Sequence, residues 1–110
     1  MQREQKVTRL EWEAIHFNYT YLLDQMAPDE VLPHLAAQRL LTPQKVREVQ
    51  EKTNRLQKIA TILEALHGQR IVGMLPTFCA ALASAAGQEH IAETLTHCEY
   101  ITCVHLYFLL

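Results

Sequence analysis

Residues Thr53 to Gly68 read TNRLQKIATILEALHG, and this stretch carries the clearest pattern in the chain. Its apolar residues recur at steps of three and four and form one face, which consists of Leu56, Ile59, Ala60, Leu63 and Leu66. Such spacing predicts an amphipathic α-helix that buries one side against other elements. Thr53 or Asn54 can cap the first turn, and Gly68 is a typical helix end.

The same spacing predicts three helices before this segment, with expected ranges of 8–26, 29–38 and 43–51. Thr42 and Pro43 form a typical start for the third, because threonine accepts a hydrogen bond from a first-turn amide and proline suits the first helical position. Pro33 lies within the second range. It must occupy the first turn or kink the helix, because its ring prevents an interior hydrogen bond.

Two further helices are expected after Gly68. The first carries Phe78 and Leu82 on its apolar face and ends at Gly87, and the second covers 89–96. Whether residues 71–74 already belong to the first of these helices stays open, because a glycine and a proline there act in opposite ways. Six short helices joined by short connections predict an antiparallel bundle.

Composition supports an all-α, single-domain fold. The chain has 110 residues, of which 49% are hydrophobic and 20% charged, and this balance is typical of one globular domain. Only three glycines and four prolines leave little material for the many turns of a small β-fold. Ten basic residues against 12 acidic residues give a net charge of −2. A chain with this balance has no general electrostatic attraction to nucleic acid or to an anionic membrane, and we expect neither as a partner.

The C-terminal stretch, residues 96–110, differs from the expected helical domain at 1–95. From Tyr100 onward nine of eleven residues are apolar, without helical spacing, and the run is shorter than the roughly 20 residues that span a bilayer. The stretch also contains the one group of metal-type ligands, which consists of His97, Cys98, Cys103 and His105. Their spacing matches no common zinc pattern, so we expect neither a metal nor another cofactor.

No catalytic pattern stands out, and we expect no enzymatic activity. The chain lacks a G-x-S-x-G turn, a glycine-rich phosphate loop and an H-E-x-x-H pair. Cys79 lies on the apolar face of its expected helix, which favours a buried packing thiol over a nucleophile. The odd number of cysteines, three, is more typical of a reducing compartment, so the sequence predicts a cytoplasmic protein.

Charge is unevenly distributed along the chain. Residues 10–38 contain five acidic and no basic side chains, whereas residues 39–70 contain seven basic and three acidic ones. If the fold gathers these into a basic face and an acidic face, copies of the domain or related domains would be complementary. The alternative is that these are ordinary solvated surfaces, because an exposed ion pair contributes only about 0–1 kcal/mol.

Several segments in order resemble caspase recruitment domains. The residues that carry the resemblance are Pro28–Leu35 (PDEVLPHL), Leu40–Pro43 (LLTP), Thr53–Gly68, Phe78–Leu82 (FCAAL) and Gly87–Leu95 (GQEHIAETL). The resemblance covers roughly residues 8–95, which is most of the chain. The resemblance implies a six-helix death fold of Greek-key type, with a first helix that is often bent.

The resemblance also implies binding to other caspase recruitment domains, in a caspase, an adaptor or a nucleotide-binding receptor, with self-association or filaments as a further outcome. In that family a basic patch on helices 1 and 4 meets an acidic patch on helices 2 and 3. Transferred to this sequence, the basic face consists of Arg9, Arg55 and Lys58. The acidic face consists of Asp29, Glu30 and Glu48.

Two alternatives to an adaptor in apoptotic or inflammatory signalling remain open. A recruitment domain without further modules could be a decoy that blocks the assembly of such complexes. The chain could also be an unrelated small helical module that binds zinc or DNA. The mixed charges of Lys45, Arg47 and Glu48 would make a poor DNA-recognition helix.

Overall fold

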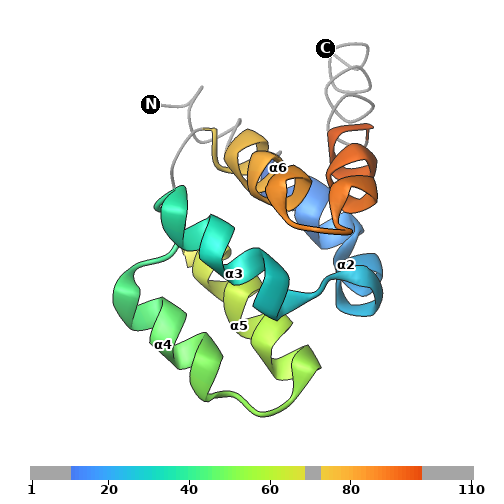
Figure 1. The fold of residues 1–110 in the computed structure, drawn as a ribbon. Coiled ribbons are helices and arrows are strands. Elements are labelled where there is room, and N and C mark those ends of the chain that lie inside the picture. The colour runs from blue at the N-terminus through green and yellow to red at the C-terminus, as the bar shows by residue number, and fades with distance from the viewer. Residues whose placement is uncertain (1–10, 69–72, 98–110) are drawn as a thin grey trace.

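The computed structural model describes residues 11–68 and 73–97, which form helices joined by short turns (Figure 1). The helices are residues 11–17, α2 (Tyr19–Gln25), α3 (Pro28–Ala37), α4 (Pro43–Glu51), α5 (Arg55–Gly68), α6 (Met74–Ser84) and residues 89–97. These two described ranges contain no strand, and the predicted all-α fold class is confirmed.

The predicted first helix is divided into two segments at Asn18. The Asn18 side chain donates a hydrogen bond from Nδ2 to the Ala14 carbonyl oxygen at 2.8 Å. Its backbone N–H is shared between the carbonyl oxygens of Ala14 and Ile15, at 3.3 and 3.1 Å. Asparagine side chains compete with the backbone in this way and interrupt helices. The interruption separates residues 11–17 from α2.

Helix α3 begins at Pro28, one residue before the predicted start, because proline suits the first helical position. Pro33 is the sixth residue of α3 and is exposed, and the helix continues past it to Ala37. Placement of Pro33 in the first turn is therefore wrong. The helix extends past a proline that cannot donate the hydrogen bond of that turn.

The starts of α4 and α5 match their predicted caps. Thr42 Oγ1 accepts a hydrogen bond from the Lys45 N–H at 3.2 Å. Asn54 Oδ1 accepts one from the Leu56 N–H at 2.7 Å. Leu56 itself was predicted to be on the apolar face of α5, and this is wrong, because its side chain is 49% exposed in the first turn. The buried positions of α5 are Ile59, Ile62, Leu63 and Leu66.

Helix α6 starts after a glycine in the left-handed conformation. Gly73 has φ +91° and is the N-cap, so that Met74 is the first helical residue. A side chain is disfavoured at this φ, which is why glycine suits the position. Pro76 then lies within the first turn, where a missing N–H costs no hydrogen bond. Residues 71 and 72, which were left open above, lie outside the described residues.

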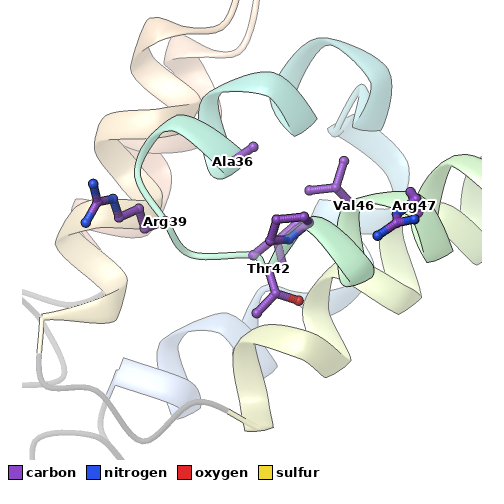
Figure 2. A pocket seen from close by; sticks show the side chains of 7 residues that line it. Ala36, Arg39, Thr42, Val46 and Arg47 are labelled. Carbon is purple, nitrogen blue, oxygen red and sulfur yellow. The ribbon is translucent and has the colours of Figure 1, made fainter.

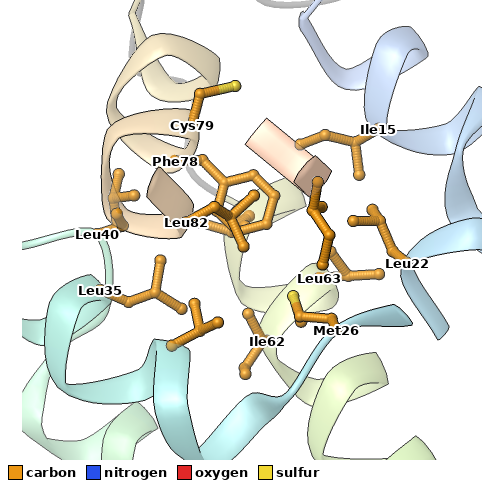
Figure 3. Packing of buried hydrophobic residues seen from close by; sticks show 14 of the residues in the cluster. Ile15, Leu22, Met26, Leu35, Leu40, Ile62, Leu63, Phe78, Cys79 and Leu82 are labelled. Carbon is orange, nitrogen blue, oxygen red and sulfur yellow. The ribbon is translucent and has the colours of Figure 1, made fainter. Parts of the chain in front are cut away.

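The core contains side chains from every described helix and surrounds Phe78 (Figure 3). Helix α3 contacts α4, α5 and α6, while α5 also packs against α2 and α4. Cys79 is 8% exposed, so the predicted buried thiol is confirmed. The last helix buries Ile91, Ala92 and Leu95 as predicted. Each large apolar side chain buried here contributes about 1.5–3 kcal/mol to folding.

Two buried polar side chains join helix ends that are distant in sequence. Gln88 Oε1 accepts the Ala27 N–H at 2.9 Å, which ties the turn before α3 to the start of the last helix. Glu11 Oε1 accepts the Gly73 N–H at 2.9 Å, which ties the first helix to the start of α6. Each of these bonds gives an acceptor to a backbone N–H in a turn, where no carbonyl of a helix is available to it.

Candidate partner-binding surface

Arg55, predicted to belong to a basic binding face, holds the end of α2. Its Nη1 donates to the Leu23 carbonyl oxygen at 2.6 Å, and its Nη2 donates to those of Asp24 and Met26 at 2.9 and 2.8 Å. The last carbonyls of a helix lack partners within the helix, and they carry the negative end of its dipole. Arg55 therefore satisfies the C-terminus of α2 from the first residue of α5.

Lys58, one turn further along α5, is paired with an acidic residue of the same chain. Its Nζ donates to Asp29 Oδ1 at 2.9 Å, with Lys58 18% exposed and Asp29 75% exposed at the side chain. The lysine is thus largely covered, while most of the aspartate faces solvent. This pair joins the start of α5 to the start of α3.

The two predicted faces adjoin each other at these residues. A small cleft of about 360 Å³ is lined by Ala27, Pro28, Asp29, Glu30, Thr53, Arg55 and Lys58, and we call it the mixed-charge cleft. Asp29 and Glu30 were predicted to belong to an acidic face, and Arg55 and Lys58 to a basic one. The structure brings all four to a single cleft, because the turns before α3 and before α5 lie next to each other.

Two of the predicted site residues lie elsewhere. Glu48 is on α4 and accepts a hydrogen bond at Oε2 from Lys45 Nζ at 3.0 Å, in a pair that is exposed on both sides. Glu48 does not line the mixed-charge cleft. Arg9 lies outside the described residues, as do Cys98, Cys103 and His105 of the metal-type group. Residues 11–68 and 73–97 hold no cluster of three side chains able to bind a metal ion.

A second cleft, which was not predicted from the sequence, lies between the end of α3 and the start of α4. Its volume is about 770 Å³, and it is lined by Ala36, Arg39, Leu41, Thr42, Pro43, Val46 and Arg47. We call it the two-arginine cleft. Figure 2 shows Arg39 and Arg47 at opposite ends, with Ala36, Thr42 and Val46 between them. Both arginines were counted among the bases of residues 39–70, but nothing in their spacing indicates a shared cleft.

The aromatic residues of the first helix contribute one exposed side chain. Trp12 packs against the core and has its ring 4.3 Å from that of His67, measured between centroids. Phe17, by contrast, is 82% exposed. It is one of two large apolar side chains that the described residues leave exposed, the other being Leu56.

One family model matches this chain, that of the caspase recruitment domain, over residues 12–98. The match covers most of the chain and nearly all of the described residues. No curated protein and no solved structure matches. Among the helices described here, none is both long and apolar enough to cross a membrane.

Proposed function

The chain belongs to the caspase recruitment domain family, and we propose that it acts as an adaptor that binds other such domains through the mixed-charge cleft and the predicted residues around it. Members of this family are homotypic interaction modules of apoptotic and inflammatory signalling, and they bind other caspase recruitment domains. The observation that carries the proposal is the family match over residues 12–98. The partner is a caspase, an adaptor or a nucleotide-binding receptor that contains this domain.

The exposed acids of α3 supply the attraction in this proposal. Asp29 uses one carboxylate oxygen, Oδ1, for Lys58, and its side chain remains 75% exposed. Glu30 is exposed beside it. A basic residue of a partner can therefore approach both carboxylates without displacing a buried group. Glu48 on α4, paired with Lys45 and with its side chain 39% exposed, adds a separate acidic position to the proposed binding residues.

The basic residues of the mixed-charge cleft already have partners within the chain, so they do not form a freely exposed basic patch. Lys58 can exchange Asp29 for a carboxylate of the partner when a partner base neutralises Asp29. Such an exchange conserves the number of ion pairs, so its net effect on affinity is modest and its effect on orientation is larger. Arg55 holds the end of α2 and so positions this edge of the cleft. Arg9 completes the basic set from outside the described residues.

A binding experiment with Glu30→Lys tests the proposal. Purified caspase recruitment domains from caspases, adaptors and nucleotide-binding receptors are assayed by biolayer interferometry at low and at moderate salt. We expect about a tenfold loss of affinity for the partner that binds, because a like-charge contact replaces an attractive one. Glu64→Lys, at an exposed position of α5, is the matched control with the same charge change and should bind normally.

A charge swap at the ion pair keeps the fold and tests the surface. Asp29→Lys combined with Lys58→Asp can form the same intramolecular pair with its ends exchanged. Circular dichroism should be unchanged, while partner binding should weaken, because the exposed end of the pair is now positive. Binding of the swap variant and of Glu30→Lys at wild-type affinity would contradict the proposed surface.

Adaptor and decoy are separated by the effect on a polymerising partner. An adaptor shortens the lag of filament growth when it is added below the partner's concentration, and a decoy stalls growth by capping ends. We favour the adaptor because the domain has the two-arginine cleft in addition to the mixed-charge cleft, so that one copy offers two separate charged surfaces to partners. The proposal places the protein in the cytoplasm, in keeping with its odd number of cysteines.

A further inference from the structure

The two-arginine cleft differs from the mixed-charge cleft because its cations have no partner among residues 11–68 and 73–97. Within the described residues, neither Arg39 nor Arg47 makes an ion pair or a side-chain hydrogen bond. Both are exposed. The surface between them is largely apolar or neutral, with Ala36, Leu41 and Val46 among its lining residues. Two unpaired guanidinium groups around an apolar floor form a surface suited to a partner with two carboxylates.

Arg39 occupies a strained backbone position. Its φ is +60°, and it is the only residue other than glycine with positive φ among the described residues. It follows α3, where the Leu40 N–H bonds to the Leu35 carbonyl at 3.0 Å and the Arg39 N–H to that of Ala36 at 3.1 Å. This pair of bonds is a Schellman motif, whose left-handed residue is usually glycine. Arginine at this position costs backbone strain that glycine would avoid, which directs attention to its side chain.

A groove of opposite character lies between α6 and the last helix. It has a volume of about 830 Å³ and is lined by Pro76, Cys79, Ala80, Ala83, Glu89, Ala92, Glu93, Thr96 and His97. Glu89 and Glu93 are exposed, lie one helical turn apart, and make no ion pair within the described residues. Three alanines line the groove and leave room for long side chains. We call it the acidic groove.

We propose that the two-arginine cleft of one copy docks onto the acidic groove of a second copy of this chain. The stems of Arg39 and Arg47 would lie over the alanines, and their guanidinium groups would pair with Glu89 and Glu93. The two surfaces are complementary in charge, since one carries two arginines and the other two glutamates. The proposal goes beyond the partner binding above, since it uses none of the residues of the mixed-charge cleft.

The positions of the two surfaces determine the kind of assembly. In Figure 1, α4 and the helix at 89–97 lie at opposite ends of the ribbon. A contact between two different surfaces is heterologous, and a docked pair leaves one unused cleft and one unused groove. The contact therefore continues from copy to copy, either as a closed ring or as an open helical chain.

The test measures self-association of the full chain by analytical ultracentrifugation over a rising concentration series at low salt. Arg39→Glu with Arg47→Glu should weaken association about a hundredfold, because like charges then face each other. Glu89→Arg with Glu93→Arg should weaken it similarly. An equimolar mixture of these two double variants should associate again into alternating assemblies, since the cleft of each variant is complementary in charge to the groove of the other.

Single substitutions test whether weaker association results from loss of the contact or from unfolding of the domain. Arg47→Glu is compared with Lys52→Glu, an exposed residue next to α4 with the same charge change, and only the former should weaken association. Circular dichroism should be the same for both. A wild-type chain that stays monomeric throughout the series, or double variants that associate like the wild type, would overturn the proposal. Loss of partner binding in Glu30→Lys concerns the other cleft and leaves this result unaffected.

Discussion

Two groups of basic side chains in this domain differ in what they contact. At the mixed-charge cleft, Arg55 bonds three carbonyls at the end of α2, and Lys58 pairs with Asp29. At the two-arginine cleft, Arg39 and Arg47 face solvent without an ion pair among the described residues. The first group stabilises the fold in addition to lining the proposed binding cleft, whereas the second has no such structural contact among the described residues. The formal charge of a side chain thus says little about its role until its nearest acceptor is known.

The largest expected effect concerns Arg55. Arg55→Ala removes three hydrogen bonds to carbonyls and should lower the free energy of unfolding by about 2 kcal/mol. Urea denaturation followed by circular dichroism measures this. Arg47→Ala is the matched control and should change stability by less than about 0.5 kcal/mol, because its side chain makes no polar contact within the described part of the chain. Equal losses of unfolding free energy in the two variants would show that Arg55 stabilises the fold no more than Arg47 does.

An intermediate effect of opposite sign is expected at Arg39. Arg39→Gly should raise the free energy of unfolding by about 1 kcal/mol, because glycine adopts φ +60° without a steric penalty. Thermal melting gives the same answer as an increase in Tm. Arg39→Asn, which also tolerates this conformation, should give a smaller gain. A decrease in stability in both variants would mean that the arginine makes a stabilising contact.

The smallest effect is expected for the pair of Asp29 and Lys58. A double-mutant cycle with Asp29→Asn and Lys58→Met should give a coupling energy of about 0.5 kcal/mol, because the aspartate is largely exposed and water screens the pair. The coupling should fall further when the salt concentration of the urea titration is raised. A coupling of several kcal/mol would place this pair with Arg55 as a main support of the fold.

Helix positions could largely be predicted from the sequence, and the reasons are local. Thr42 with Pro43, and Asn54 before α5, cap helices through bonds to residues two or three positions away. Apolar spacing identified the buried faces of α6 and the last helix, with Phe78, Leu82 and Leu95 in the core. The sequence pattern fails at a helix end and at a proline inside a helix. Leu56 follows the apolar spacing but lies in an end turn, and Pro33 is tolerated in the second turn of α3.

The candidate surfaces could be predicted only in part. The charge distribution and the family resemblance pointed to Asp29, Glu30, Arg55 and Lys58, and the structure places these four around one cleft. That the cations there are engaged by the same chain could not be predicted, because their acceptors lie about 30 positions earlier. The two-arginine cleft was missed for a similar reason. No local pattern indicates that Arg39 has a positive φ or that it shares a cleft with Arg47.

The amino-acid sequence by itself determined the helical class, most helix ends and the family, since each depends on spacing or capping over a few neighbouring residues. The tertiary structure alone decided which charges remain available to a partner. A charged side chain forms an ion pair or hydrogen bond only with a group within a few ångströms. The fold brings such groups together from distant positions in the chain, so the distance along the sequence does not predict the distance in space.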